Sequence, residues 1–507
     1  MDKTIKILAV AAIIIFSIQS FSNNKADVDL WGNVGFVKAL PWSQEFHRTN
    51  TFSFTEPEHT WINHEWLAEY IFNKVYLIAG SPGLIALKIL IGLLIAALLN
   101  ISIKKHCDSG LLRFLLLMLM ISTIGYGFSI RPHLFTYLML TIFLTTLQNL
   151  DKNRLLILAA LPLLGLVWVN FHGAFFIGII LTLIFTCTES IKVLSEGRFT
   201  KERRYIMALS SVLLFLIAVS FINPYGADLW KFILNSATAF RPYLSEWAPF
   251  NPVLHFTDHT DFMALALLSF ASLLFSKKPK DITWSCILLI AFLSALLLRR
   301  NIPIFAIVAC FVIPEHLEDA AGKPLDGILK LLPKTIIPIL LCLFIPVSAW
   351  YSVMVKKTTP SKVEIPQDRF PSGVISFIKD NNIKGNMLVF FDWAEYCIWK
   401  LYPDCRVFLD GRFTDAYSMK TVTDYLNFLY LGSDWDLVLK NYPVDMILIH
   451  KGNPVYKKIP YLKNWQLVSE DGISGLFLNT SVHSMTISRL SPAQPIIIKG
   501  NSAELFP

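Results

Sequence analysis

Charged residues are scarce in this chain of 507 residues: Asp, Glu, Lys and Arg make up only 16% of it, against about 25% in a typical soluble protein. Hydrophobic residues make up 54%, which excludes a soluble multidomain protein and predicts a membrane protein. The net charge is +8, but Lys and Arg are scattered between apolar segments, which argues against a nucleic-acid-binding face. The seven cysteines include no C-x-x-C pair, so neither a disulfide framework nor a cysteine-rich zinc site is expected.

Long apolar runs divide much of the chain. Because lipid offers the backbone no hydrogen-bond partner, runs of about 18 residues predict transmembrane helices. We therefore predict a polytopic α-helical membrane protein with about eleven transmembrane helices, the first a retained anchor rather than a cleaved signal peptide. The expected spans are 5–22, 83–103, 110–129, 132–149, 154–170, 173–191, 205–222, 261–276, 282–298, 301–316 and 334–353.

Charge predicts the orientation. With the N-terminus in the cytoplasm, the Lys- and Arg-rich connections all fall on the inner side, as the positive-inside rule requires. These connections are 1–6, 104–113, 150–154, 192–204, 276–281 and 315–334. A large first outer loop, 23–82, and everything after about 354 are then extracytoplasmic.

The C-terminal part differs in composition from the rest. Short β-rich runs (MLVFF, 406–410, 445–450, 475–479) alternate with helical stretches (373–381, 421–431), a pattern that predicts a small α/β domain with a partly parallel sheet. The predicted organisation is a transmembrane domain over 1–355, this extracytoplasmic α/β domain over 356–480, and a loose polar tail over 481–507. No internal repeat is found.

Polar residues of the outer side suggest a functional site. The first loop carries the D-x-D pair Asp27 and Asp29, then Glu56, Glu58 and His59, then His64 and Glu65. Other outer corners carry Arg131, His133, His172, Glu246, Arg299 and Arg300. Ionisable groups near a membrane usually face a cavity, and outer arginines suit an anionic ligand. The plainer alternatives are a solvated loop with interfacial aromatics, and arginines that contact lipid headgroups.

Three further residues have open roles. Lys88 lies inside the second span and either extends to the interface, the preferred interpretation, or neutralises a phosphate. Cys397 and Cys405 are able to pair only if the outer side is oxidising. The sequence alone does not decide these alternatives.

The ordered set of motifs resembles the GT-C superfamily of integral-membrane glycosyltransferases, and within it a bacterial Rgt-type, protein mannosyltransferase-like subgroup. The resemblance covers nearly the whole chain; its blocks are D-V-D-L-W (27–31), FSFTEPEHTWINHEWLAEYIF (52–72), SIRPHLFTY, WVNFHGAFFIG, INPYG, EWAPFNP, RRNIPIF, Trp393–Trp399 and Asp410-Gly411-Arg412. Asn33 departs from the subgroup's pattern, which expects a larger polar group there.

The resemblance implies transfer of a sugar from a polyprenyl-phosphate donor to an acceptor hydroxyl, with inversion, at the outer face of the inner membrane. It implies that Asp29, with Asp27 as second choice, is the general base. Arg131, Arg299 and Arg300 would then hold the phosphate, and His64 and Glu65 would position the acceptor. Metal dependence is open: no metal ligand is assigned, although Mg²⁺ or Mn²⁺ is conceivable for carboxylates.

Two other functions compete with this one: a transporter of lipid-linked saccharide, and a non-catalytic membrane scaffold. A transporter is expected to show inverted repeats and charges at the bilayer midplane. The Asp410-Gly411-Arg412 motif also has a plain interpretation, an ion pair that fixes a turn, which we prefer over acceptor recognition. The sugar, the acceptor and the lipid length are not encoded in any recognised pattern.

Overall fold

The structure is a computed structural model of the whole chain. It describes residues 3–37, 40–44, 46–150, 158–238, 245–325, 327, 333, 335–350, 362–490, 496–498 and 504–507. The chain divides into two compact units: unit 1 comprises 1–23, 85–226 and 240–360, and unit 2 comprises 24–84, 227–239 and 361–507. The predicted domain boundary at 355–356, the start of the span 154–170 and the end of the span 334–353 lie outside the described residues.

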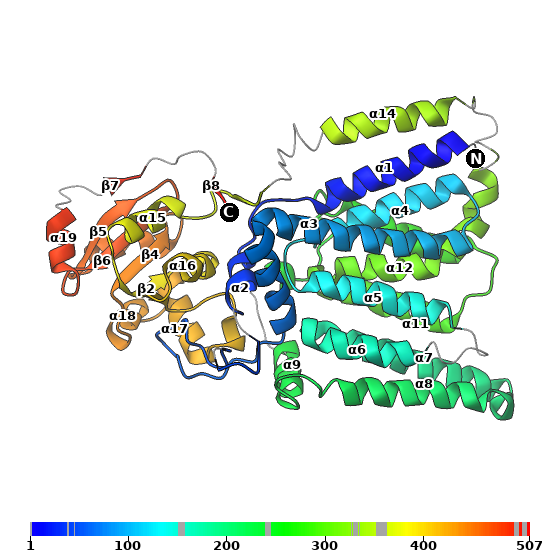
Figure 1. Cartoon of the computed structure of the whole chain (residues 1–507), viewed down its shortest axis with the longest axis horizontal. Helices are drawn as coiled ribbons and strands as arrows, with labels where there is room; N and C mark the ends of the chain where they lie inside the picture. The colour runs from blue at the N-terminus through cyan, green and yellow to red at the C-terminus, as the bar shows by residue number, and fades with distance from the viewer. Residues whose placement is uncertain are drawn as a thin grey trace. The chain divides into compact units, whose positions relative to one another are not determined.

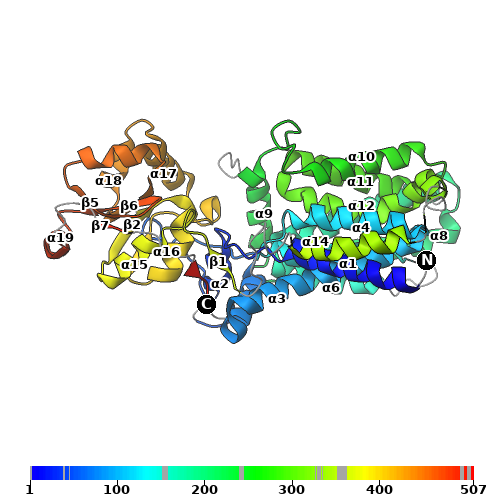
Figure 2. The same cartoon turned by 90° about the horizontal axis from the view of Figure 1, so that it is seen from above.

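Unit 1 is built from helices (Figure 1, Figure 2). They are α1 (Lys3–Phe21), the second part of α3 (Trp66–His106), α4 (Gly110–Gly125), α5 (His133–Gln148), α6 (Ala160–Phe171), η2 (Gly173–Phe175), α7 (Phe176–Ser195), α8 (Phe199–Val219), η3 (Ser245–Trp247), α10 (Thr260–Phe275), α11 (Ile282–Leu297), η4 (Arg299–Asn301), α12 (Ile302–Leu317), the π-helical turn η5 (Glu318–Gly322) and α14 (Ile336–Trp350).

Helix α12 is the centre of unit 1. Nearly all of its side chains are buried, and it packs against α4, α5, α10 and α11. Peripheral helices expose apolar side chains instead, such as Leu267 and Leu274 on α10. Large exposed apolar residues on helices whose backbone groups bond internally are what a lipid environment requires.

The structure agrees with the predicted helical membrane class. A helix covers most of the described part of each expected span. By length and composition, three described helices are able to cross a membrane: Lys3–Phe21, Trp66–His106 and Gly173–Ser195. The count of eleven spans stays a prediction, because several of the other apolar helices are shorter.

Unit 2 contains the first part of α3, which is interrupted at Gly80, where φ is +61° and favours glycine. It also contains a mixed sheet and its helices. The elements are α2 (Leu30–Gly35), α9 (Asp228–Thr238), β1 (Glu364–Ile365), α15 (Ser372–Asp380), β2 (Gly385–Val389), η7 (Phe391–Trp393), α16 (Ala394–Leu401), β3 (Cys405–Val407), η8 (Phe413–Asp415), α17 (Met419–Tyr430), η9 (Trp435–Leu437), α18 (Val438–Asn441), β4 (Met446–His450), η10 (Pro454–Lys457), η11 (Ile459–Tyr461), β5 (Trp465–Glu470), β6 (Ser474–Asn479), α19 (Ser484–Leu490), β7 (Ile496–Ile497) and β8 (Glu504–Leu505).

The sheet has the order β3-β2-β4-β6-β5-β7. Strand β2 runs parallel to β3 and β4, whereas β6 pairs antiparallel with both β4 and β5. The expected β-rich runs coincide with β2, β3, β4 and β6. Strand β5 was not predicted.

The first loop packs on this sheet within unit 2. Ser53 bridges Val407 in a parallel sense, and the Val407 N–H donates to the Phe52 carbonyl at 3.2 Å. The loop thereby covers the edge strand β3. At the start of the same loop, the Ala26 N–H donates to the Glu364 carbonyl at 2.7 Å. Segments that are far apart in sequence therefore form one hydrogen-bonded body.

The prediction of a loose tail after 480 was wrong for the described part of it. Strand β7 pairs with β5, and β8 pairs with β1. Phe506 is fully buried, and its ring packs against those of Trp31, Tyr76 and Trp399. The prediction followed the polar, Pro-containing composition of the segment and overlooked the single large apolar residue Phe506.

Candidate functional site

The D-x-D pair stands at the start of α2. The backbone N–H of Asp29 donates to Asp27 Oδ1 at 3.1 Å. The Asn33 N–H then donates to the Asp29 carbonyl at 3.0 Å, which begins the helix. This turn, in which an Asp side chain bonds the backbone two residues on, fixes Asp29 at the helix terminus. Both carboxylates are half-buried.

Glu395 on α16 faces α2. Its side chain is only 6% exposed, and its Oε2 accepts a hydrogen bond of 3.0 Å from the Gly32 N–H. Burial, together with the negative charges of Asp29 and Asp410, raises the pKa of Glu395 well above its usual range. These surroundings therefore favour the neutral form of Glu395.

Gly411 lies beside both carboxyl groups. A Cβ atom at Gly411 would collide with Glu395 Oε1 and would lie 3.5 Å from Asp29 Oδ1. Both acids therefore approach the same small patch of backbone. A side chain at this position would displace one of them.

The Asp410-Gly411-Arg412 motif forms a buried ion pair. Arg412 Nε donates to Asp410 Oδ1 at 2.9 Å and Nη2 to Oδ2 at 2.6 Å, a bidentate arrangement. Tyr417 also donates to Asp410 at 2.7 Å, and Arg412 donates to Asn50 of the first loop at 2.6 Å. The preferred interpretation, an Asp–Arg pair that fixes a turn, agrees with this geometry.

Aromatic rings enclose the same guanidinium. Arg412 Cζ lies 4.7 Å from the ring centre of Phe36, 5.3 Å from that of Phe52 and 4.5 Å from that of Trp61. Rings at these distances attract a cation. The motif thus joins the first loop to the sheet by charge and by packing.

His64 and Glu65 lie next to each other, with His64 Nε2 and Glu65 Oε1 3.5 Å apart. Burial opposes the charged form of His64, but the carboxylates of Glu65 and Asp415 outweigh it and raise the pKa of His64. The His64 ring packs on Phe232 of α9 at 4.8 Å. The neighbouring carboxylates therefore favour the cationic form of His64.

Glu56 connects the first loop to the start of α17, a role that the sequence did not suggest. Its carboxylate accepts from the Ser418 backbone N–H at 3.0 Å and from the Thr421 hydroxyl, at the start of α17. His59 pairs with it at 3.2 Å. Burial alone would raise the pKa of Glu56, but the hydrogen bonds from Ser418 and Thr421 lower it.

The remaining predicted site residues belong to unit 1. Arg131 is paired with Glu246, with 3.2 Å between Arg131 Nη1 and Glu246 Oε2. The guanidinium of Arg300 lies 4.6 Å from the ring centre of Trp247, and the Arg299 N–H donates to the Ala248 carbonyl at 3.3 Å. The chain itself thus supplies an anionic partner for Arg131. The predicted substrate-binding role of these residues stays a prediction.

The two histidines of unit 1 that were predicted as site residues hold backbone and side chains in place. His133 Nε2 donates to the Gly127 carbonyl at 2.6 Å. Thr136 Oγ1 lies 2.9 Å from His172 Nδ1 and accepts from Trp168 Nε1 at 2.9 Å. Both rings therefore join helices or turns, and their proposed part in substrate binding stays a prediction.

Lys88 is buried within unit 1. It is 2% exposed and donates to the Asn23 carbonyl, and its extension to the interface stays a prediction. Cys397 and Cys405, whose pairing was left open, are both buried free thiols.

Among the described residues, no group of three or more His, Cys, Asp or Glu side chains is arranged to hold a metal ion.

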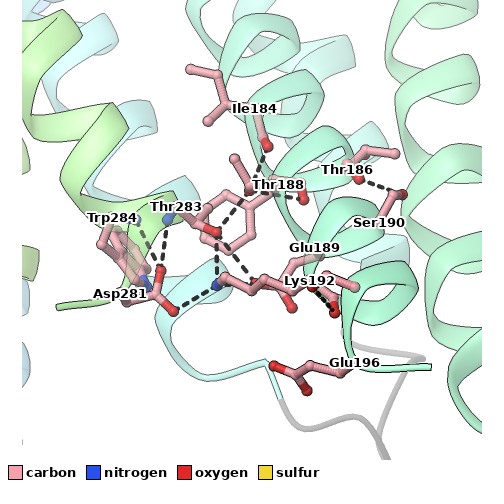
Figure 3. Close-up of polar contacts among 12 residues, drawn as sticks. Ile184, Thr186, Thr188, Glu189, Ser190, Lys192, Glu196, Asp281, Thr283 and Trp284 are labelled. Carbon is pink, nitrogen blue, oxygen red and sulfur yellow. Dashed lines mark hydrogen bonds and ion pairs between the residues drawn. The ribbon is translucent and has the colours of Figure 1, made fainter. Parts of the chain in front are cut away.

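Lys192, at the start of a connection predicted to be cytoplasmic, stabilises the packing of two helices. Lys192 of α7 donates to Glu189 at 2.6 Å and to Asp281 at 2.7 Å (Figure 3). Asp281 in turn accepts from the Thr283 and Trp284 N–H groups at the start of α11. This network connects α7 to α11.

Sequence reasoning singled out Asp27, Asp29 and the Asp410-Gly411-Arg412 motif, and missed Glu395. Glu395 falls inside the quoted block Trp393–Trp399. No local pattern marked it, because its contact with Gly32 joins residues 363 positions apart.

Comparisons with known proteins complete the description. No protein-family model matches the chain, and no curated protein does. Among solved structures, the chain is similar to the cryo-EM structure of the arabinofuranosyltransferase AftD from Mycobacteria, with 13% identity and a TM-score of 0.42. The match covers 94% of this chain but only 40% of that one, so the chain spans less than half of its length. A TM-score this low does not establish a shared fold.

Proposed function

We propose that the chain is an integral-membrane glycosyltransferase of the GT-C type. It transfers a sugar from a polyprenyl-phosphate donor to an acceptor hydroxyl, with inversion, at the extracytoplasmic face of the inner membrane. Asp29 is the general base in this proposal. Unit 2, with the first loop and the C-terminal segment, is extracytoplasmic.

The observation that carries the proposal is the approach of Asp29 and Glu395 to the same position, Gly411. Burial and the neighbouring acidic charges favour the neutral form of Glu395. Asp29, in contrast, is only half-buried. One ionised carboxylate, fixed by a turn and reachable from solvent, suits a general base.

The reaction needs little more from the chain. Asp29 takes the acceptor hydroxyl proton as the acceptor oxygen bonds to the anomeric carbon. The bond between that carbon and the phosphate oxygen breaks, and polyprenyl phosphate leaves with the electron pair. Arg131, Arg299 and Arg300 are proposed to stabilise the departing anion, and His64 with Glu65 to position the acceptor.

The test is transfer by the detergent-purified chain, with polyprenyl-phosphate sugars as donors and a panel of acceptors. Asp29→Asn is expected to reduce kcat by about 10²–10⁴-fold, the usual contribution of a general base. Donor binding is expected to stay unchanged, because the substitution removes the base and not the phosphate ligands.

Glu58→Gln is the matched control, because Glu58 is an exposed carboxylate of the same loop and should leave transfer unaffected. Undiminished transfer by Asp29→Asn would contradict the assignment of the base. Donor binding by the unmodified chain with no transfer to any acceptor would favour a scaffold instead.

A further inference from the structure

A second feature of unit 2 is a polar cavity of about 370 Å³ between the first loop, α9 and η8. Its lining residues come from three distant parts of the sequence and include Asp228, Lys231, Phe232, Asn235, Thr414 and Asp415. The volume falls within the range of small-molecule sites. Neither Asp29 nor Glu395 lines this cavity.

Helix α9 provides one wall. Asp228, Lys231, Phe232 and Asn235 recur every three or four residues, which places them on one helical face. Leu229, one position beyond Asp228, is buried. The helix therefore anchors itself with an apolar face and presents polar groups to the cavity.

The charges in this wall largely cancel. Lys231 donates to Asp228 at 2.8 Å, and Asp415 on the opposite wall adds a second carboxylate. An anion would meet two carboxylates and a lysine that is already engaged. A neutral ligand rich in hydroxyl groups suits this lining, because hydroxyls both donate to carboxylates and accept from amides and hydroxyls.

Thr414 supplies an unused polar atom. Its Oγ1 is buried and has no hydrogen-bond partner among the described residues. An unsatisfied buried polar group is destabilising, so a ligand hydroxyl that reaches this atom would supply the missing hydrogen bond. The preceding turn is fixed, because the Asp415 N–H donates to the Arg412 carbonyl at 2.9 Å.

This turn also connects the cavity to the proposed base. Gly411, which approaches Asp29 Oδ1, precedes Thr414 by three residues. Three residues of chain span at most about 11 Å. A ligand in the cavity therefore lies near the carboxylate that would deprotonate it.

We propose that this cavity is a subsite for a neutral saccharide, the acceptor of the transfer reaction. The identification of the saccharide as the acceptor rests on the proposed function. Saccharide binding rests on the cavity alone. Hydroxyl and amide groups of Thr414 and Asn235 bind sugar hydroxyls, and the Phe232 ring supplies an apolar face.

The experiment measures saccharide binding separately from transfer. Methyl glycosides of glucose, galactose, mannose and N-acetylglucosamine are titrated into the detergent-purified chain and followed by saturation-transfer NMR. We expect at least one to bind. Thr414→Val and Asn235→Ala are each expected to weaken that binding about threefold to tenfold, the loss of one hydrogen bond of roughly 0.5–1.5 kcal/mol.

Stability separates a binding role from a structural one. Thr414→Val removes a hydroxyl that has no partner among the described residues, so its melting temperature should equal or exceed that of the unmodified chain. Leu234→Ala is the matched control, because Leu234 lies on the same helix, is 62% exposed and does not line the cavity. It should bind glycosides normally.

Asp29→Asn keeps the two proposals distinguishable, since it should strongly reduce transfer and retain glycoside binding. A chain that binds glycosides through Thr414 but transfers no sugar would overturn the transferase function and leave the saccharide site standing. Failure of every glycoside to bind the unmodified chain, or undiminished binding by both cavity variants, would overturn the saccharide site.

Discussion

Glu395 is a buried carboxyl group whose surroundings penalise its charged form. Its folded pKa is raised by burial and by its acidic neighbours, Asp29 and Asp410. The protonated form is therefore favoured in the folded state, and the stability it contributes is fully present below the unfolded pKa of about 4.3. That stability is lost as the pH rises through the folded pKa, because the unfolded chain releases the proton first.

Glu395→Gln should therefore stabilise the chain at neutral and higher pH. Gln is neutral at every pH and retains an oxygen for the Gly32 N–H. We expect the melting temperature at pH 8 to rise by at least about 2–4 °C, the shift that 1 kcal/mol produces in a domain of 150–250 residues. The two proteins should melt alike near pH 4. A lower melting temperature for the variant at pH 8 would mean that Glu395 is ionised in the folded chain.

At the scale of elements, the turn after β3 holds the first loop on the sheet. Asp410 is fully buried and accepts from Arg412 and Tyr417. Asp410→Asn leaves a buried guanidinium without its counter-charge, which typically costs about 3–5 kcal/mol. We expect a large loss of thermal stability and rapid proteolysis of the first loop.

Asp404→Asn is the control variant. Both side chains of the Lys384–Asp404 ion pair are more than half exposed, and such pairs contribute about 0–1 kcal/mol to stability. Equal losses in the two variants would contradict the structural role of the motif.

The elements that the sequence predicts well are those with a local pattern. Apolar runs marked the helices of unit 1, and short β-rich runs marked β2, β3, β4 and β6. Strand β5, WQLVSE, was missed because its apolar positions are few. The pairing of the first loop with β3 and the contact of Gly32 with Glu395 were also missed. Both depend on segments more than 350 residues apart, for which no local periodicity exists. Half of the carboxyl pair at the site was therefore predictable, and its partner was not.

At the scale of the whole molecule, composition limits the possibilities more than any motif does. A chain with 54% hydrophobic residues has too few polar side chains to cover several soluble domains. Charged residues make up only 16% of the chain, and the distribution of Lys and Arg among the connections predicts the orientation in the membrane. The compact unit formed by the first loop and the C-terminal segment adds a constraint. If that unit folds on one side of the membrane, the residues on either side of the intervening helices must emerge on that same side.

This constraint gives a labelling test of the orientation. The exposed native thiols Cys187 and Cys342 are first replaced by serine. The Tyr461→Cys variant then carries one thiol on η11 of unit 2, where Tyr461 is 86% exposed. A second variant, Lys201→Cys, carries one at an exposed position of α8 in the predicted inner connection. With a membrane-impermeant maleimide on intact cells, the Tyr461→Cys protein should be labelled. The Lys201→Cys protein should react only after permeabilisation, because basic connections are retained inside. The opposite pattern would place the proposed base and its carboxyl partner in the cytoplasm, and an extracytoplasmic sugar transfer would then be impossible.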